Sequence, residues 1–264
     1  MPTPIYVVDA FASAPFRGNP AGVVITDQPL APALMRGIAA EMKHSETAFA
    51  VRQDDGWALR WLTPVAEVDL CGHATLATAH VLWETGRVKP SGTIRFSTRS
   101  GELVARNVDG VTIELDFPAL VPVLFAAPFD LAPALGVPVI ETWRSRDDVL
   151  VLARGERAVR EAKPDLRLLA TLPVRGLVLT AACEDRTVDF VSRFFAPAVG
   201  VDEDPVTGSA HCALAPFWAA RLGKTKMRAS QLSERRGELE VELVGDRVKL
   251  RGRAVTIVRG ELAV

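Results

Sequence analysis

The sequence has little of several features that define particular classes of protein. Only three cysteines occur among its 264 residues, Cys71, Cys183 and Cys212, which are too few and too scattered for a disulfide framework or a CxxC zinc site. Lys and Arg number 31 and Asp and Glu number 32, so the chain has no overall positive charge to attract nucleic acid or an anionic membrane. We therefore expect no nucleic-acid partner, no membrane partner and a reducing compartment.

Long apolar runs are missing as well. No segment approaches the roughly 18 uninterrupted apolar residues of a membrane-spanning helix. The segment 1–9 lacks the basic residues and the long apolar run of a signal peptide. Hydrophobic residues make up 48% and charged residues 24%, which is typical of a globular protein with a substantial core. These observations predict a soluble, cytoplasmic protein.

Several motifs of cofactor-dependent and hydrolytic enzymes are also absent. The chain contains no GxGxxG, P-loop, HExxH or GxSxG pattern, which argues against dinucleotide-dependent, nucleotide-fuelled and serine-hydrolase chemistry. The four histidines, His44, His73, His80 and His211, show neither HxH nor HxxxH spacing. From this spacing we expect no metal site.

Two halves of the chain share short motifs in the same order. The distance between Gly72 and Gly208 is 136 residues, a second pair of segments has the same offset, and a third pair has an offset of 133. The pairs are Cys71–Ala74 with Thr207–Ala210, Ser97–Leu103 with Ser233–Leu239, and Arg60–Pro64 with Arg193–Pro197. Nearly constant offsets indicate a duplicated α/β unit, with a small insertion in one copy, rather than chance matches.

The repeat and the apolar patterns predict the organisation of the chain. Residues 72–82 are expected to form a helix rich in small residues, and residues 32–43 another helix. Prolines between residues 117 and 133 indicate the boundary between the units. We therefore expect domains at 1–118 and 119–253.

In each unit a glycine stands at the expected start of a helix, in Gly72-His73-Ala74 and in Gly208-Ser209-Ala210. A helix N-terminus presents unpaired N–H groups and a partial positive charge, and glycine allows an anion to approach the backbone closely. The two segments are therefore candidate binding sites for a carboxylate or phosphate. The alternative is that both glycines serve only close helix packing.

Two acidic residues lie near these motifs. Glu46 begins an apolar segment, and burial there would raise the pKa of its carboxyl and make it a proton carrier near neutral pH. The alternatives are that Glu46 faces water or pairs with Lys43. Asp204 ends the acidic run Asp202–Asp204 before the second helix, where a solvated turn or a helix cap near Thr207 is the other interpretation.

Cys71 precedes Gly72 at the expected helix start, a position that lowers the pKa of a thiol. The equivalent residue in the second unit is Thr207. A two-thiol racemase needs one thiol on each side of its substrate, and this chain offers only one. Cys71 is therefore either a single catalytic thiol or a small buried apolar residue.

At these residues the chain resembles the phenazine biosynthesis PhzF-like family of the diaminopimelate epimerase superfamily, and within it the phenazine-biosynthesis-like-domain proteins. The similar segments span nearly the whole chain: Asp9–Phe11, Phe16–Val24, Ser45–Phe49, Leu70–Thr75, Ser192–Pro197 and Glu203–His211. The resemblance implies an α/β (α+β) fold of two similar domains, each a strongly curved sheet around a central helix. It also implies that the final strand, about 254–264, returns to the first domain and that the active site lies between the domains.

The resemblance further implies an isomerase without metal or cofactor that acts on a small carboxylate-bearing substrate, and dimers are common in the family. The family's catalytic glutamate falls on Glu46. The residues implied for substrate binding are Asn19, Gly72, His73, Asp204, Gly208 and Ser209. The epimerase branch has a second cysteine where this chain has Thr207, which favours the glutamate mechanism. The alternatives are a one-thiol racemase, epimerase or dehydratase that uses Cys71, and a non-catalytic binding protein.

Overall fold

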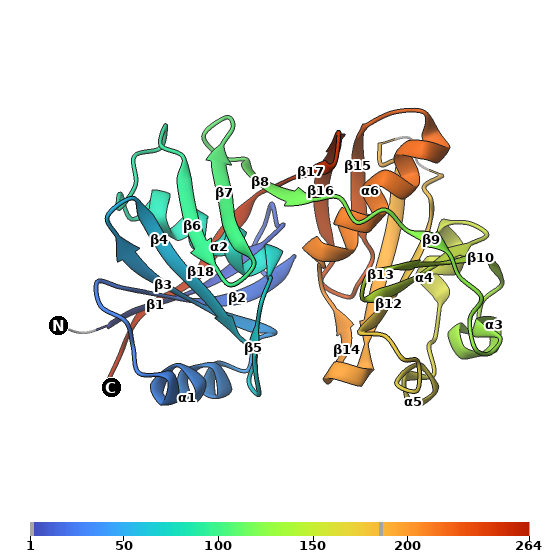
Figure 1. Cartoon of the computed structure of the whole chain (residues 1–264), viewed down its shortest axis with the longest axis horizontal. Coiled ribbons are helices and arrows are strands. Elements are labelled where there is room, and N and C mark those ends of the chain that lie inside the picture. The colour runs from blue at the N-terminus through green and yellow to red at the C-terminus, as the bar shows by residue number, and fades with distance from the viewer. Residues whose placement is uncertain (1–2, 185–186, 264) are drawn as a thin grey trace. The chain divides into compact units, whose positions relative to one another are not determined.

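The computed structural model describes residues 3–184 and 187–263, and these form a mixed α+β fold in two compact units (Figure 1). Unit 1 contains Met1–Phe117 and Arg251–Val264, and unit 2 contains Pro118–Leu250. The mixed α+β class expected from the sequence is confirmed. The common origin of the units stays a prediction from the repeated motifs.

Unit 1 is built mainly of strands. In chain order its elements are β1 (Thr3–Ala10), β2 (Asn19–Thr26), α1 (Pro32–Met42), β3 (Glu46–Gln53), β4 (Gly56–Leu62), β5 (Glu67–Val68), α2 (Gly72–Glu84), β6 (Ile94–Thr98), β7 (Gly101–Asn107), β8 (Ile113–Pro118) and β18 (Ala254–Leu262). The pairing is antiparallel from β1 to β2, parallel from β2 to β3, antiparallel from β3 to β4 and parallel from β4 to β6. The final strand β18 pairs with β1 in antiparallel register.

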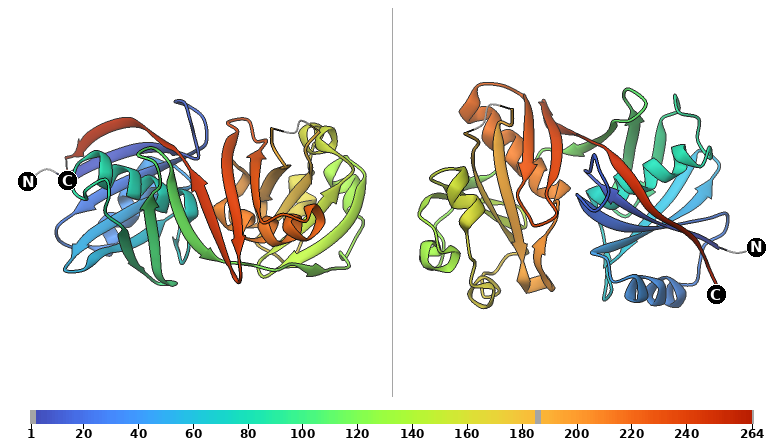
Figure 2. Two further views of the ribbon diagram at one scale, coloured as in Figure 1. Left: turned by 90° about the horizontal axis from the view of Figure 1, so that it is seen from above. Right: turned by 180° about the vertical axis from the view of Figure 1, so that it is seen from behind.

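Helix α2 is the buried helix of unit 1. Its residues from Gly72 to Ala79 are all buried, and it contacts β1, β2, β3 and β18. A helix that is apolar on every side belongs in a core. The hydroxyls of Thr75 and Thr78 are compatible with this burial because they donate hydrogen bonds to the carbonyls of Cys71 and Ala74 at 2.5 and 2.7 Å. Figure 2 shows the twisted strands of unit 1 beside this helix.

Unit 2 has a similar order of elements. They are β9 (Val123–Leu124), α3 (Leu131–Leu135), β10 (Val139–Ser145), β11 (Asp148–Ala153), α4 (Glu156–Glu161), α5 (Leu166–Leu169), β12 (Gly176–Ala182), β13 (Phe190–Ala196), a 3-10 turn (Pro197–Val199), β14 (Val201–Asp204), α6 (Gly208–Leu222), β15 (Lys226–Gln231), β16 (Gly237–Val244) and β17 (Arg247–Gly252). From β10 through β11, β12 and β13 to β15 the pairing is again antiparallel, parallel, antiparallel and parallel. In both units the buried helix lies in the chain between the last two strands of this series. Helix α2 lies between β4 and β6, and helix α6 lies between β13 and β15.

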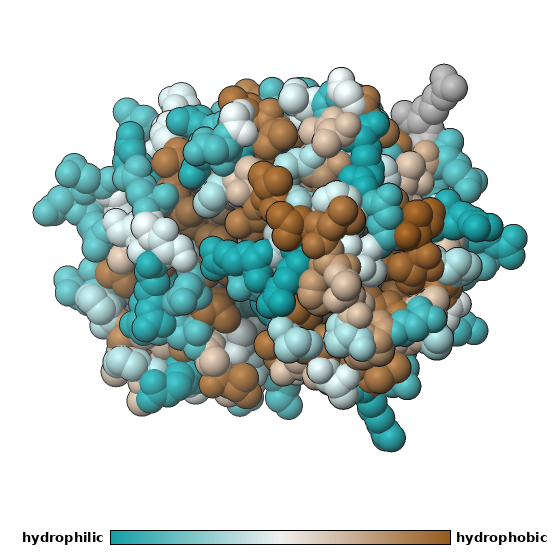
Figure 3. Space-filling model, turned by 45° about the vertical axis from the view of Figure 1, so that its right-hand side comes forward, coloured by the Kyte–Doolittle hydropathy of each residue, from teal (hydrophilic) through white to brown (hydrophobic). Residues whose placement is uncertain are grey.

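The surface carries both kinds of side chain. On the face drawn in Figure 3, hydrophilic side chains are spread widely and hydrophobic ones lie in smaller groups between them. Within the described residues, the helices are all too short or too polar to cross a lipid bilayer.

Candidate active site

Glu46 is the first residue of β3. Helix α1 ends at Lys43, whose left-handed backbone (φ 52°) turns the chain and donates a hydrogen bond from its N–H to the carbonyl of Ala39. The strand then enters the core, since the residues from Thr47 to Ala50 are all buried. The side chain of Glu46 is only 18% exposed. The local fold thus holds a carboxylate at the edge of an apolar strand, which excludes the interpretation of a fully solvated surface acid.

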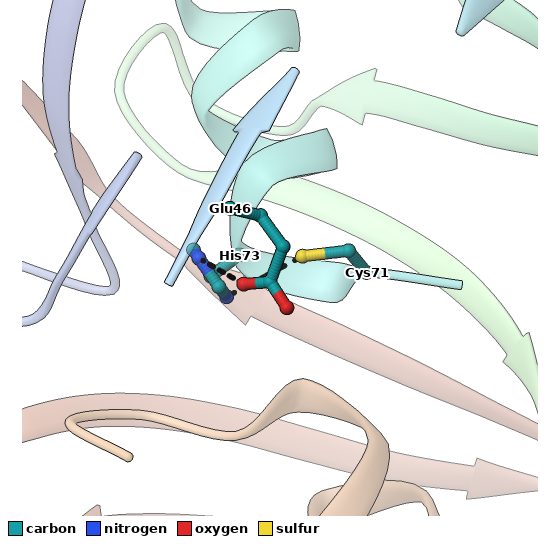
Figure 4. A group of neighbouring side chains, drawn as sticks. All are labelled: Glu46, Cys71 and His73. Atoms are coloured by element: carbon teal, nitrogen blue, oxygen red, sulfur yellow. Dashed lines mark hydrogen bonds and ion pairs between the residues drawn. The ribbon is translucent and has the colours of Figure 1, made fainter. Parts of the chain in front are cut away.

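Cys71 and His73 lie at the start of α2. Cys71 is the N-cap in extended conformation, and its side chain makes no capping hydrogen bond to the helix backbone. Both residues are buried, at 6% and 4% exposure. Figure 4 shows the side chains of Glu46, Cys71 and His73 directed toward one another, although Glu46 comes from a different element.

The imidazole of His73 is the centre of this group. Its Nε2 lies 3.3 Å from Oε2 of Glu46, and its Nδ1 lies 3.5 Å from Sγ of Cys71 (Figure 4). The same Nδ1 also lies 3.2 Å from Nδ2 of Asn19. With the Asn19 amide oriented this way, its NH₂ donates to Nδ1 and the ring proton lies on Nε2; the opposite amide orientation exchanges these roles. Nε2 is buried and faces the Glu46 carboxylate, 3.3 Å from its Oε2.

Burial also determines the charge of His73. Its complete burial, and secondarily the nearby His44, lower the pKa of His73 to about 3. The ring is therefore neutral at physiological pH, so its close contact with Glu46 is not an ion pair.

Asn19 lies behind the histidine. It is the first residue of β2, it is completely buried, and it is separated from His73 by 54 positions in the sequence. In the structure its amide contacts the imidazole and so fixes the orientation of the ring. Asn19, Glu46, Cys71, Gly72 and His73, all selected from the sequence, therefore meet in one small region of unit 1.

Three residues of this region, Glu46, Cys71 and His73, also carry side chains that can bind a metal ion. One ligand atom each from Glu46, Cys71 and His73 lies within 4.8 Å of the others. The spacing of the histidines in the sequence could not reveal this group. Its third member, Glu46, is distant in sequence and approaches the other two only through the packing of β3 against α2. The Cys-x-His pair at residues 71–73 is the one local signal that could have drawn attention to it.

The corresponding residues of unit 2 form a different arrangement. Thr207 is the N-cap of α6, and its hydroxyl donates to Oδ2 of Asp204 at 2.5 Å. Gln231 accepts a hydrogen bond from the Thr207 N–H at 2.9 Å and donates one to the Asp204 carbonyl at 2.7 Å. These bonds fix the turn before Gly208, so Asp204 has a structural partner and is not simply a solvated acid.

Sequence reasoning missed Arg175, the residue before β12. Its Nη2 donates to Oγ of Ser209 at 3.0 Å, while its Nε donates to Oδ1 of Asp148 at 2.9 Å. Burial tends to lower the pKa of Arg175, yet Asp148 holds it above its usual value; burial likewise raises the pKa of Asp148, although Arg175 opposes this. An arginine at a strand start carries no sequence signal of this role.

Comparison with known proteins identifies the family. Residues 8–260 match the model of the family described as phenazine biosynthesis-like protein. An uncharacterized isomerase of Pseudomonas aeruginosa is 51% identical over 255 residues, which cover 97% of this chain and 96% of that protein.

Solved structures agree with this match. The crystal structure of a phenazine biosynthesis protein of the PhzF family from Enterococcus faecalis covers 100% of both chains, with a TM-score of 0.95 and 40% identity. A probable proline racemase from Agrobacterium radiobacter, at 14% identity, shares the fold alone, with a TM-score of 0.69 over 99% of this chain and 93% of that one. These matches confirm the resemblance found in the sequence, and the chain belongs to the phenazine biosynthesis-like protein family.

Proposed function

We propose that the protein is a cofactor-independent isomerase that moves a proton on a small carboxylate-bearing substrate, with Glu46 as the proton carrier. The observation that carries this proposal is the contact between the mostly buried Glu46 and the neutral His73. A carboxylate in a protected site beside a neutral imidazole is a suitable general base, because that neighbour carries no charge to neutralise it.

In the proposed reaction, Glu46 removes a proton from a carbon made acidic by an adjacent double bond or carboxyl group. The electrons of the broken C–H bond delocalise into that neighbouring group, and the protonated Glu46 returns the proton to a different carbon. The N–H groups at the start of α2, near Gly72, stabilise the negative charge that develops. General acid–base catalysis of this kind contributes about 10²–10⁴-fold to the rate.

In this proposal Gly208 and Ser209 also bind a substrate carboxylate, and Asp204 orients the substrate. The bond between Arg175 and Ser209 supports an anion-binding role, because it places a cation beside the hydroxyl at the start of α6. His73 and Asn19 position Glu46 and the substrate in unit 1.

A second candidate function uses Cys71 as the single catalytic group of a racemase, epimerase or dehydratase of a small amino or hydroxy acid. Its thiol lies 3.5 Å from Nδ1 of His73, within reach of a hydrogen bond to the ring. The Cys71→Ala variant would then lose turnover, whereas Glu46→Gln would retain it.

Deuterium incorporation from heavy water tests the proposal across many candidate substrates at once. A panel of small unsaturated, hydroxy and amino carboxylic acids is incubated with the protein in D₂O, and exchange at carbon is followed by NMR. We expect exchange into at least one compound, its loss in Glu46→Gln, and its retention in the matched control Glu41→Gln, which changes an exposed carboxylate of α1. A protein that binds panel members without exchanging any proton would instead be a non-catalytic binding protein.

A further inference from the structure

We propose that Glu46, Cys71 and His73 form a binding site for one Zn²⁺ ion, and that the bound ion blocks the proton carrier. The first part stands on the geometry of unit 1 alone. The second part rests on the proposed function, since it requires that Glu46 is the group that moves the proton.

The donor atoms lie near enough to one another to surround a zinc ion after small side-chain movements. Zinc bonds of roughly 2.0–2.3 Å in a tetrahedron place neighbouring ligand atoms about 3.4–3.6 Å apart. Oε2 of Glu46 lies 3.3 Å from Nε2 of His73, and Sγ of Cys71 lies 3.5 Å from Nδ1 of the same ring, so an ion that binds one ring nitrogen has one neighbouring ligand at about the zinc spacing and draws the other closer. A set with one ligand atom per residue has no separation above 4.8 Å. Closing around an ion therefore requires side-chain movements of about 1 Å, within the range of small rotamer adjustments.

The chemistry of the three ligands selects zinc over the abundant hard cations. Thiolate and imidazole ligands suit Zn²⁺ and its close analogue Co²⁺, whereas Mg²⁺ and Ca²⁺ require oxygen ligands. On binding, the Cys71 thiol loses its proton to solvent, and one ring nitrogen of the neutral His73 donates its electron pair. The two negative charges of Glu46 and Cys71 then balance the charge of the ion, which favours a site as little exposed as this one.

The backbone already holds two of the three ligands in place. Cys71 and His73 are separated by one residue at the start of α2, a rigid and buried helix, and Glu46 enters from the first residue of β3. Three protein ligands leave a fourth position for water or for a carboxylate of the substrate. Because the ion takes the electron pairs of the Glu46 carboxylate, that carboxylate can no longer remove a proton from carbon.

Titration with Co²⁺ tests the site by a readout that does not depend on activity. The full-length protein is freed of metal with a chelator and titrated with Co²⁺, whose bond to a thiolate produces a charge-transfer absorption. We expect one equivalent of Co²⁺ to bind and to produce this charge-transfer absorption. Added Zn²⁺ should displace the Co²⁺ and remove the absorption. Cys71→Ser should abolish the absorption and weaken binding by more than about 100-fold, since it removes a ligand atom.

The other cysteines and carboxylates provide matched controls. Cys212→Ser changes a buried thiol of α6, whose pKa burial raises to about 12, and should leave Co²⁺ binding unchanged. Glu46→Gln should weaken binding, whereas Glu41→Gln should not. Equal binding by wild-type protein and Cys71→Ser, or no saturable binding below millimolar Co²⁺, would overturn the site.

Zinc added to the exchange assay separates the two parts of the inference. We expect one equivalent of Zn²⁺ to stop deuterium exchange and a chelator to restore it. If Zn²⁺ binds through Cys71 but exchange continues at the same rate or accelerates, the site stands and its inhibitory role is refuted. If no exchange is found in any condition, the proposed function fails while the Co²⁺ result still decides the site.

Discussion

The starts of α2 and α6 have the same framework but different chemistry. The first reads Cys71-Gly72-His73 and lies beside a carboxylate, whereas the second reads Thr207-Gly208-Ser209 and lies beside an arginine. Unit 1 therefore collects groups that can exchange protons, and unit 2 collects hydroxyls and a permanently charged cation. The common framework fixes where a side chain stands, and the identity of that side chain decides what it does.

The strand registers make the comparison more specific. Glu46 lies opposite Ala21 on the parallel strand β2, and Gly176 lies opposite Asp148 on the parallel strand β11. A Cβ at Gly176 would lie 2.5 Å from Cζ of Phe194 and 3.0 Å from the carbonyl of Phe195, so a side chain here would require the Phe194 ring to move. Unit 2 thus has a glycine, and no carboxylate, at the start of the strand that corresponds to β3.

The buried histidine of α6, His211, gives the largest expected effect on stability. Burial lowers the pKa of His211 to about 4, although its bond to the Thr207 carbonyl opposes this. The unfolded chain, with a histidine pKa of about 6.5, binds the proton more readily, so stability falls as the pH drops from about 6.5 toward 4. We expect wild-type protein to lose on the order of 3 kcal/mol over this range through His211. Urea unfolding at several pH values should show a flatter profile for His211→Gln, and parallel profiles would contradict this assignment.

The second effect concerns the amide behind His73. Asn19→Ala removes the hydrogen bond to Nδ1 and lets the imidazole rotate away from Glu46. Since misplacement of a catalytic group by about 1 Å costs about 100-fold, we expect a decrease of that size in kcat for exchange, with a smaller change in KM. Asn19→Gln serves as the conservative variant for partial rescue. A variant with lower melting temperature but unchanged kcat would show that Asn19 is only structural.

The smallest expected effect concerns the ion pair between Arg175 and Asp148 in unit 2. Arg175→Met leaves the Asp148 carboxylate buried without its cation, which we expect to cost about 1–3 kcal/mol after allowance for the partial exposure of Arg175. Burial raises the pKa of Asp148 even with its partner present, and removing the cation raises that pKa further. A buried acid with a raised pKa is tolerated when protonated, so the variant should be less destabilised at pH 5 than at pH 8. Equal losses in urea unfolding at both values would contradict this account.

Much of the framework could be predicted from local sequence. The apolar segment at 72–82 predicts the buried helix α2, observed over Gly72–Glu84, and the segment 32–43 predicts α1, observed over Pro32–Met42. These predictions succeed because helix periodicity and small-residue composition are local properties. The resemblance to a family selected Glu46, His73 and Asn19, but their mutual contacts were not readable from the sequence.

Those contacts depend on packing between distant segments. Asn19 and His73 are 54 positions apart, and Arg175 and Ser209 are 34 apart. No local pattern encodes which side chains meet when β2, β3 and α2 pack, and the same holds for β12 and α6. The metal-ligand geometry was missed for this reason, since only the Cys-x-His pair is local.

The central claim is that Glu46, and not Cys71, moves the proton. The most direct measurement compares the deuterium exchange rates of Glu46→Gln and Cys71→Ala with wild-type protein, on the same substrate and in the presence of a chelator. The account predicts that Glu46→Gln is slower by about 10²–10⁴-fold, the contribution of a general acid–base group, while Cys71→Ala stays within a few-fold of wild type. Near-normal exchange by Glu46→Gln together with loss of exchange in Cys71→Ala would contradict the account and assign the reaction to the thiol.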